Sequence, residues 1–77
     1  MTIEIVKKQM EKLLRWARTP DFSAKSCYYM AMGAVLMASN TALELNDIKL
    51  SMAIDKLWNN PYRELFLQVY REELARQ

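Results

Sequence analysis

Residues 27–38 read CYYMAMGAVLMA and form the longest apolar run of this chain, closed by Ser26 and Ser39. The run carries no charge, and it is shorter than the roughly 20 residues that a helix needs to cross a bilayer. A helix that is apolar on nearly every side is usually the buried, central one of a bundle. The run therefore predicts a core helix and no association with a membrane.

The central helix is expected from the N-cap Ser23 to about Leu43. Thr41 and Glu44 resemble a capping box, which would restart a helix there, whereas Asp47 offers a later start. We prefer a helix that continues to Leu43, followed by a short turn. The predicted core stripe comprises Ala24, Tyr28, Ala31, Val35, Ala38 and Ala42, with Cys27, Met30, Ala34 and Met37 in a second stripe beside it.

A first helix is predicted over residues 3–18, capped by Thr2 and stopped by Thr19 and Pro20. Its apolar residues recur at spacings of three and four, and charged residues occupy the opposite side. The expected core stripe is Ile3, Val6, Met10, Leu13 and Ala17, with Leu14 beside it, and Glu4–Lys8 and Glu11–Arg15 are expected to pair.

Two further helices are predicted in the second half of the chain. One spans residues 47–58, with an apolar stripe of Leu50, Ala53, Ile54 and Leu57. The next begins at Asn60 as cap and Pro61 as first helical residue, and runs almost to Gln77. The sequence thus predicts one all-α domain over residues 1–77, a compact bundle of three to four helices with the second helix central.

The composition argues against an enzyme and against a metal or other cofactor. The chain has no histidine and only one cysteine, Cys27, so imidazole bases and the usual zinc sites are absent. Glu72 and Glu73 are adjacent on a helix and diverge by about 100°. Cys27 itself is interpreted as a small buried hydrophobe, and Met10, Met30 and Met37 as filling gaps in the core. The lone cysteine indicates a reducing, cytoplasmic location.

The positive charge is concentrated at the start of the chain, where the first 18 residues carry five basic against two acidic side chains. Lys8, Lys12 and Arg15 lie on one face and could contact nucleic-acid phosphates, but Glu4 and Glu11 interrupt that face. Use of the third helix as a DNA-reading helix is disfavoured, because its expected exposed residues include two acids. That expected set is Asp47, Lys49, Ser51, Asp55 and Lys56.

Apolar surface in excess of one core is the main functional signal. The side of the second helix away from its alanines carries Tyr29, Met32 and Leu36 beside Lys25. A second excess stripe on the last helix comprises Leu67, Tyr70 and Leu74. Contiguous exposed apolar surface commonly marks an interface. The alternative is a four-helix arrangement that buries the Tyr29/Met32/Leu36 face in its core.

We therefore expect a non-enzymatic protein-interaction module that binds another protein of unknown identity and also self-associates as a homo-oligomer. An adaptor, or a small inhibitor that occludes a site on a larger protein, has this size and composition, and such inhibitors are common on phages and mobile elements. The expected contact residues are Tyr29, Met32, Leu36, Leu67, Tyr70 and Leu74. The alternative function is a nucleic-acid-binding regulator that uses Lys8, Lys12 and Arg15.

Overall fold

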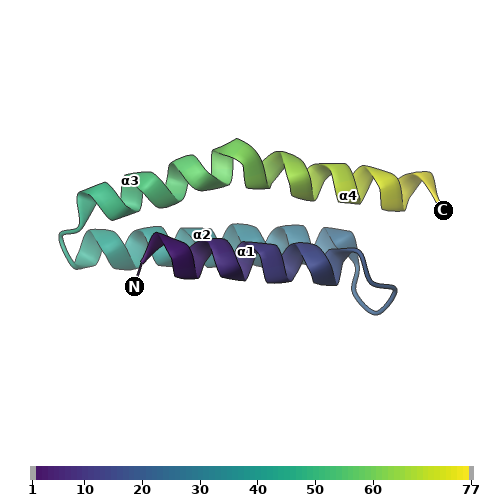
Figure 1. Ribbon diagram of the computed structural model, residues 1–77, viewed down its shortest axis with the longest axis horizontal. Helices are drawn as coiled ribbons and strands as arrows, with labels where there is room; N and C mark the ends of the chain where they lie inside the picture. Colours follow the sequence, from purple (N-terminus) through teal and green to yellow (C-terminus); the bar gives the residue numbers. More distant parts are fainter. Residues whose placement is uncertain (1, 77) are drawn as a thin grey trace.

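A computed structural model describes residues 2–76 and confirms the all-α bundle with its second helix in the centre (Figure 1). The helices are α1 (Ile3–Ala17), α2 (Ala24–Glu44), α3 (Ile48–Leu57) and α4 (Arg63–Ala75). The α1 and α2 helices run antiparallel, and α3 and α4 follow one another along the third side, where both pack on α2. The molecule is a rod of 45 × 19 × 16 Å.

The third side consists of two helices, α3 and α4, that meet at a kink without an intervening loop. The segment Trp58–Tyr62 contains this kink, where Asn60 has an extended, non-helical backbone (φ −155°, ψ 108°) and the Asn60–Pro61 peptide is cis. Proline cannot donate a helical hydrogen bond, so a break at this position agrees with the predicted boundary. Within residues 2–76 the bundle therefore has three helical sides, and no fourth helix of this range covers α2.

The core lies on one side of each helix. The buried residues of α1 are Val6, Met10, Leu14 and Ala17. Leu14 therefore takes the core position predicted for Leu13, and both Leu13 and Ile3 are only partly buried. The α2 contribution is narrow and consists mainly of small residues, namely Ala24, Cys27, Ala31, Val35, Ala38 and Ala42. The third side adds the larger groups Ile54, Trp58, Tyr62, Phe66 and Val69. Small residues on α2 let its neighbours approach closely.

Local capping explains most helix boundaries. The Ser23 hydroxyl accepts a hydrogen bond from the Ser26 amide at 3.2 Å, and the Asp47 carboxylate accepts one from the Leu50 amide at 3.1 Å, so both predicted starts are confirmed. Thr2 is the N-cap residue of α1, as predicted, and has the extended backbone of that position, but its side chain makes no capping hydrogen bond. Thr41 does not restart a helix, because its hydroxyl donates to the Met37 carbonyl one turn earlier at 2.8 Å.

A long-range cap completes the start of α2. The Glu73 carboxylate on α4 accepts a hydrogen bond from the Ala24 amide at 2.9 Å, across 49 positions of sequence. This bond satisfies one of the unpaired amides that every helix start presents, and it places negative charge at the positive end of the helix dipole. This hydrogen bond connects the C-terminal part of α4 to the first turn of α2.

Two predicted features of side-chain packing are corrected. Met30 and Met37 are 42% and 69% exposed, so they do not fill gaps in the core as Met10 does. The ion pairs that form within residues 2–76 are Glu4–Lys7 and Glu64–Arg71, and neither Glu4–Lys8 nor Glu11–Arg15 is among them. These exposed pairs contribute little to stability in either arrangement.

Candidate functional site

The groups that could carry covalent chemistry are engaged in the fold. Cys27 is fully buried, as predicted, and this burial raises the pKa of its thiol above the ordinary value of 9.0, with the Glu73 carboxylate raising it further. A protonated, inaccessible thiol is a poor nucleophile. Glu73, one of the paired carboxylates considered above, caps α2 instead of facing Glu72.

Residues 2–76 also contain no site of the kind that binds a metal ion or a small molecule. No cluster of three or more carboxylate, cysteine or histidine side chains that could hold a metal ion occurs in this range, and no pocket opens on it. The described helices also include none that is long and apolar enough to cross a membrane.

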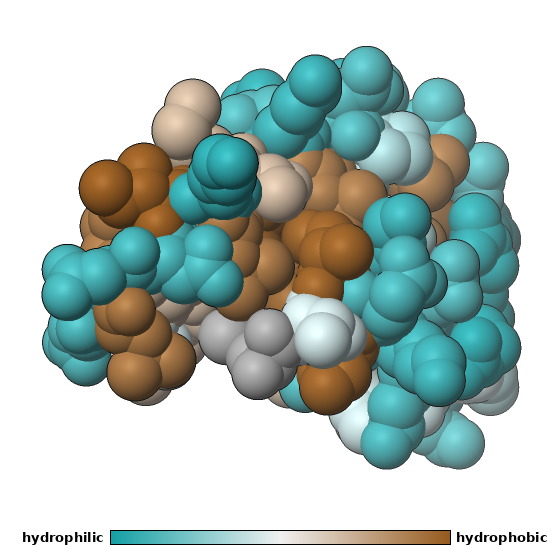
Figure 2. Space-filling model, turned by 60° about the vertical axis from the view of Figure 1, so that its left-hand side comes forward, coloured by the Kyte–Doolittle hydropathy of each residue, from teal (hydrophilic) through white to brown (hydrophobic). Residues whose placement is uncertain are grey.

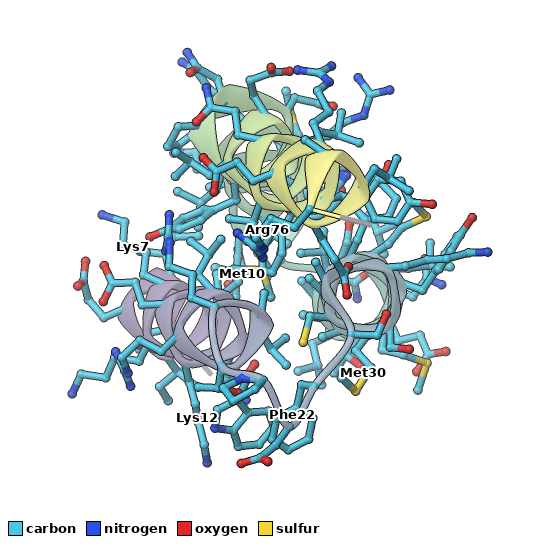
Figure 3. All side chains as sticks on the ribbon, turned by 90° about the vertical axis from the view of Figure 1, so that its right-hand side faces the viewer. Lys7, Met10, Lys12, Phe22, Met30 and Arg76 are labelled. Carbon is cyan, nitrogen blue, oxygen red and sulfur yellow. The ribbon has the colours of Figure 1, made fainter. Side chains whose placement is uncertain are left out.

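The predicted basic face of α1 is open to solvent. Lys8, Lys12 and Arg15 are all exposed, and the Lys12 ammonium lies 4.9 Å from the centre of the Trp16 ring. Trp16 also stacks on Phe22 in the α1–α2 turn, with ring centres 5.1 Å apart. Figure 3 shows Lys12 and Phe22 together on the outside of the bundle.

The set of exposed residues expected for a DNA-reading third helix is wrong at Ser51. This residue is 3% exposed, and its hydroxyl lies 2.7 Å from the Ser39 hydroxyl on α2. A buried hydroxyl pair of this kind satisfies both groups within the protein. This face of α3 is therefore a helix–helix contact with α2.

The Tyr29/Met32/Leu36 face of α2 is on the surface. The exposed fractions are 58% for Tyr29, 36% for Met32 and 60% for Leu36, so the alternative that a fourth helix buries them is excluded by this structure. Leu43 continues the face, and the exposed Met30 and Met37 widen it on one side. We call these six apolar residues, together with Gly33 and Asn40 between them, the outer face of α2.

The outer face is exposed because the three-sided bundle covers only half of α2. Residues 29, 32, 36 and 43 follow one another at helical spacings, on the side opposite Ala31, Val35 and Ala42. Viewed along the bundle, Met10 lies between the helices whereas Met30 points outward from α2 (Figure 3). The sequence pattern separated this side of α2 from the alanine side but left open whether a fourth helix covers it, because both sides are apolar.

Charge on α2 is confined to its two ends. Lys25 lies in the first turn and Glu44 is the last helical residue, and no charged residue lies between them. Both positions are unfavourable for the helix dipole, which attracts anions at the start of a helix and cations at its end. A further feature is Gly33 at the middle of the face, where an added Cβ would meet no atom within 4 Å.

The end of the bundle at the α2–α3 turn carries further exposed apolar residues that were not predicted from the sequence. Leu45, Ile48 and Met52 are 71%, 60% and 66% exposed, on the α2–α3 turn and on α3. Figure 2, which looks toward this end of the molecule, shows brown side chains in several groups between hydrophilic ones. The available signal was that Ile48 and Met52, four residues apart, share a side of α3 other than the side that carries the core residue Ile54.

The second predicted stripe, on α4, is less open. Leu67 and Tyr70 are half-buried, and Tyr70 packs against the core. Of these three α4 residues, only Leu74 is as exposed as the apolar residues on the outer face of α2, with an exposed fraction of 50%. The α4 residues therefore do not form a continuous exposed apolar face of the kind seen on α2.

Comparisons with protein-family models, with curated proteins and with solved structures found no match to this chain.

Proposed function

We propose that this chain is a non-enzymatic protein-interaction module and that the outer face of α2 is its contact surface. One observation carries the proposal: six apolar side chains with exposed fractions from 36% to 69% lie on one helix, with no charged residue between Lys25 and Glu44. A helix that faces only water normally carries charged residues on its outer side. Selection for solubility alone does not account for this surface.

The composition of the face supports a protein partner. Aromatic residues and methionine are enriched in the cores of protein interfaces, whereas lysine and glutamate are depleted there. The face contains one tyrosine and three methionines, and the flexible methionine side chains can adapt to an opposing surface. The straight rod of helices presents this surface without further rearrangement, as an adaptor or an inhibitor that occludes a site requires.

Site-specific photo-crosslinking in the native host tests the proposal. A photoreactive residue at position 36 should give adducts with protein, either a second copy of this chain or another polypeptide. The same residue at position 9, an exposed glutamine on α1, is the matched control. Adducts at position 36 that are no more abundant than at position 9 would refute the proposed contact surface.

A pair of matched variants supports this test. Leu36→Glu and Gln9→Glu introduce the same group at exposed positions, so both should keep the helical circular dichroism signal of the wild type. Leu36→Glu should remove the adducts formed from a second photoreactive position on the outer face, such as 32, whereas Gln9→Glu should leave them unchanged. Equal effects of the two variants would contradict the proposal.

A second candidate function, binding of nucleic acid by α1, rests on one observation. Lys8, Lys12 and Arg15 are exposed and belong to neither ion pair formed within residues 2–76, and Lys12 lies over the Trp16 ring. Basic residues beside aromatic rings occur in proteins that bind single-stranded nucleic acid. A steep decrease of affinity with salt would support this function, and absence of binding at low salt would exclude it.

A further inference from the structure

The residues on the outer face of α2 form complementary pairs when two copies of the helix are placed antiparallel. Six residues follow one another along the face at spacings of four, four, three, four and four, namely Lys25, Tyr29, Gly33, Leu36, Asn40 and Glu44. This order is symmetric about the midpoint between Gly33 and Leu36. A two-fold axis at that midpoint would therefore bring the first residue opposite the last, the second opposite the fifth, and the third opposite the fourth.

We propose that the occupant of the outer face is α2 of a second copy of this chain, in the antiparallel register centred between Gly33 and Leu36. This inference rests on the proposed function and names its partner. In a symmetric dimer each contact occurs twice, so a favourable pairing is doubled and an unfavourable one is doubled as well.

Charge complementarity selects the antiparallel orientation. In this register Lys25 of each copy faces Glu44 of the other, at both ends of the contact. A parallel arrangement would instead place lysine against lysine and glutamate against glutamate. The two charges also oppose the dipole of their own helix, but each would lie at the favourable end of the dipole of the other copy. The dimer thus accounts for charges that the single chain leaves unexplained.

The inner pairs are complementary in size and in hydrogen bonding. The exposed Leu36 side chain meets Gly33 of the second copy, where there is open space above the backbone. A glycine at this point allows two helices to approach closely, although glycine is unfavourable within an isolated helix. Tyr29 meets Asn40, and the phenol and the amide can exchange a hydrogen bond.

The exposed area is large enough for a stable dimer. The six apolar residues of the outer face expose on the order of 600 Å², taking roughly 200 Å² for a whole side chain of this size. Ile48 and Met52, in the first turns of α3, expose on the order of 250 Å² more by the same measure. A standard interface buries about 800 Å² per partner. The face spans residues 25–44, about 28 Å of helix, which suits a shallow crossing angle.

Charge reversal of the purified full chain tests the register. Lys25→Glu and Glu44→Lys should each raise the dimer dissociation constant about tenfold, because each replaces two attractive pairs with two repulsive ones. The double variant restores both pairs in reversed order and should return the dissociation constant to within about threefold of wild type. Sedimentation velocity over low to high micromolar protein measures all three constants, with Lys8→Glu on α1 as the matched control.

Weaker dimerisation of these variants can be distinguished from a loss of folding. Each single reversal improves the charge at one end of the α2 dipole, so the helical signal and the unfolding temperature of the monomer should be preserved or raised. Weaker association together with equal or greater monomer stability would support the antiparallel contact. Failure of the double variant to recover, or equal dissociation constants for all variants, would overturn the register.

The outcome separates this inference from the proposed function. A wild-type protein that stays monomeric at high micromolar concentration would overturn the dimer, whatever the crosslinking result. Adducts from position 36 to another polypeptide would then still support the outer face as a protein-binding surface. Absence of both the dimer and the adducts would overturn the inference and the proposed function together.

Discussion

Replacing Gly33 with alanine should stabilise the folded monomer. Gly33 lies within α2 on its outer face, and an added Cβ would meet no atom within 4 Å. The methyl group therefore causes no clash. It removes the conformational freedom that glycine gives to the unfolded chain and improves helix propensity.

The expected gain is about 0.5–1 kcal/mol in the free energy of unfolding, which is the ordinary difference between glycine and alanine inside a helix. For a domain of this size, a change of 1 kcal/mol shifts the unfolding temperature by roughly 4–8 °C. The substitution should therefore raise that temperature by about 2–8 °C.

The assay is thermal and urea unfolding followed by far-ultraviolet circular dichroism. Both measurements are made on Gly33→Ala in a Leu36→Glu background, where the proposed self-association should be removed and the unfolding temperature should not depend on protein concentration. In the wild-type background the same methyl group would lie between the two copies of α2 and should weaken association. Stability and association should thus change in opposite directions.

A lower unfolding temperature for Gly33→Ala in the Leu36→Glu background would refute the reasoning. That result would mean that residue 33 packs against another part of the monomer, and that the outer face of α2 is not open.

Three further predictions concern the interior and the response to pH. Ser51→Ala should reduce the free energy of unfolding by about 1–2 kcal/mol, because the buried Ser39 hydroxyl loses its partner at 2.7 Å and keeps only the Ser51 carbonyl at 3.5 Å. The Ser39→Ala/Ser51→Ala variant should lose less than the sum of the single changes in a double-mutant cycle. Cys27 should react slowly with iodoacetamide in the folded protein and rapidly in urea; equal rates would contradict its burial. Burial raises the pKa of Cys27 above 9.0 and, with the Glu11 carboxylate 3.4 Å away, the pKa of Tyr62 above 10.0. The unfolded chain then loses these protons first, so the contribution of these two groups to stability should be constant below about pH 9 and fall as the pH rises through the folded values, with a shallower fall in Tyr62→Phe.

The helix boundaries were predictable because they depend on neighbouring residues. The Ser23 and Asp47 caps lie within three positions of the amides that they bind, so a short window of sequence contains both partners. The α2–α3 turn is similar, because Asn46 adopts a positive φ of 61°, which asparagine tolerates better than most residues. The Glu73 cap of α2 could not be predicted, because its partner lies 49 positions away.

The exposed surface was only partly predictable. Tyr29, Met32 and Leu36 stood out because they lie opposite a row of alanines, and the structure places them outside. Met30 and Met37 were assigned to the core, because a helix that is apolar on both sides gives no sign of how far around it the neighbouring helices reach. That extent depends on the packing of α1 and of the bent α3–α4 side, which no local pattern contains.

The burial of Leu13 and Ser51 also depends on helix packing that the local sequence does not determine. Leu13 and Leu14 are equally apolar neighbours, and only the rotation of α1 against its partners determines that Leu14 enters the core. Ser51 was expected on the surface because serine usually lies there. Its burial follows from the Ser39 hydroxyl, which only the packing of α2 against α3 brings near.

The cap that α4 supplies to α2 has a consequence for the order in which the chain is made. A ribosome adds residues from the N-terminus onward, so all of α2 has been synthesised before Glu73 is added. Until that residue emerges, the Ala24 amide lacks its carboxylate partner, and the side of α2 that packs against Phe66 and Val69 is still open. A nascent chain at this stage therefore presents two apolar sides of α2, of which the finished fold covers one.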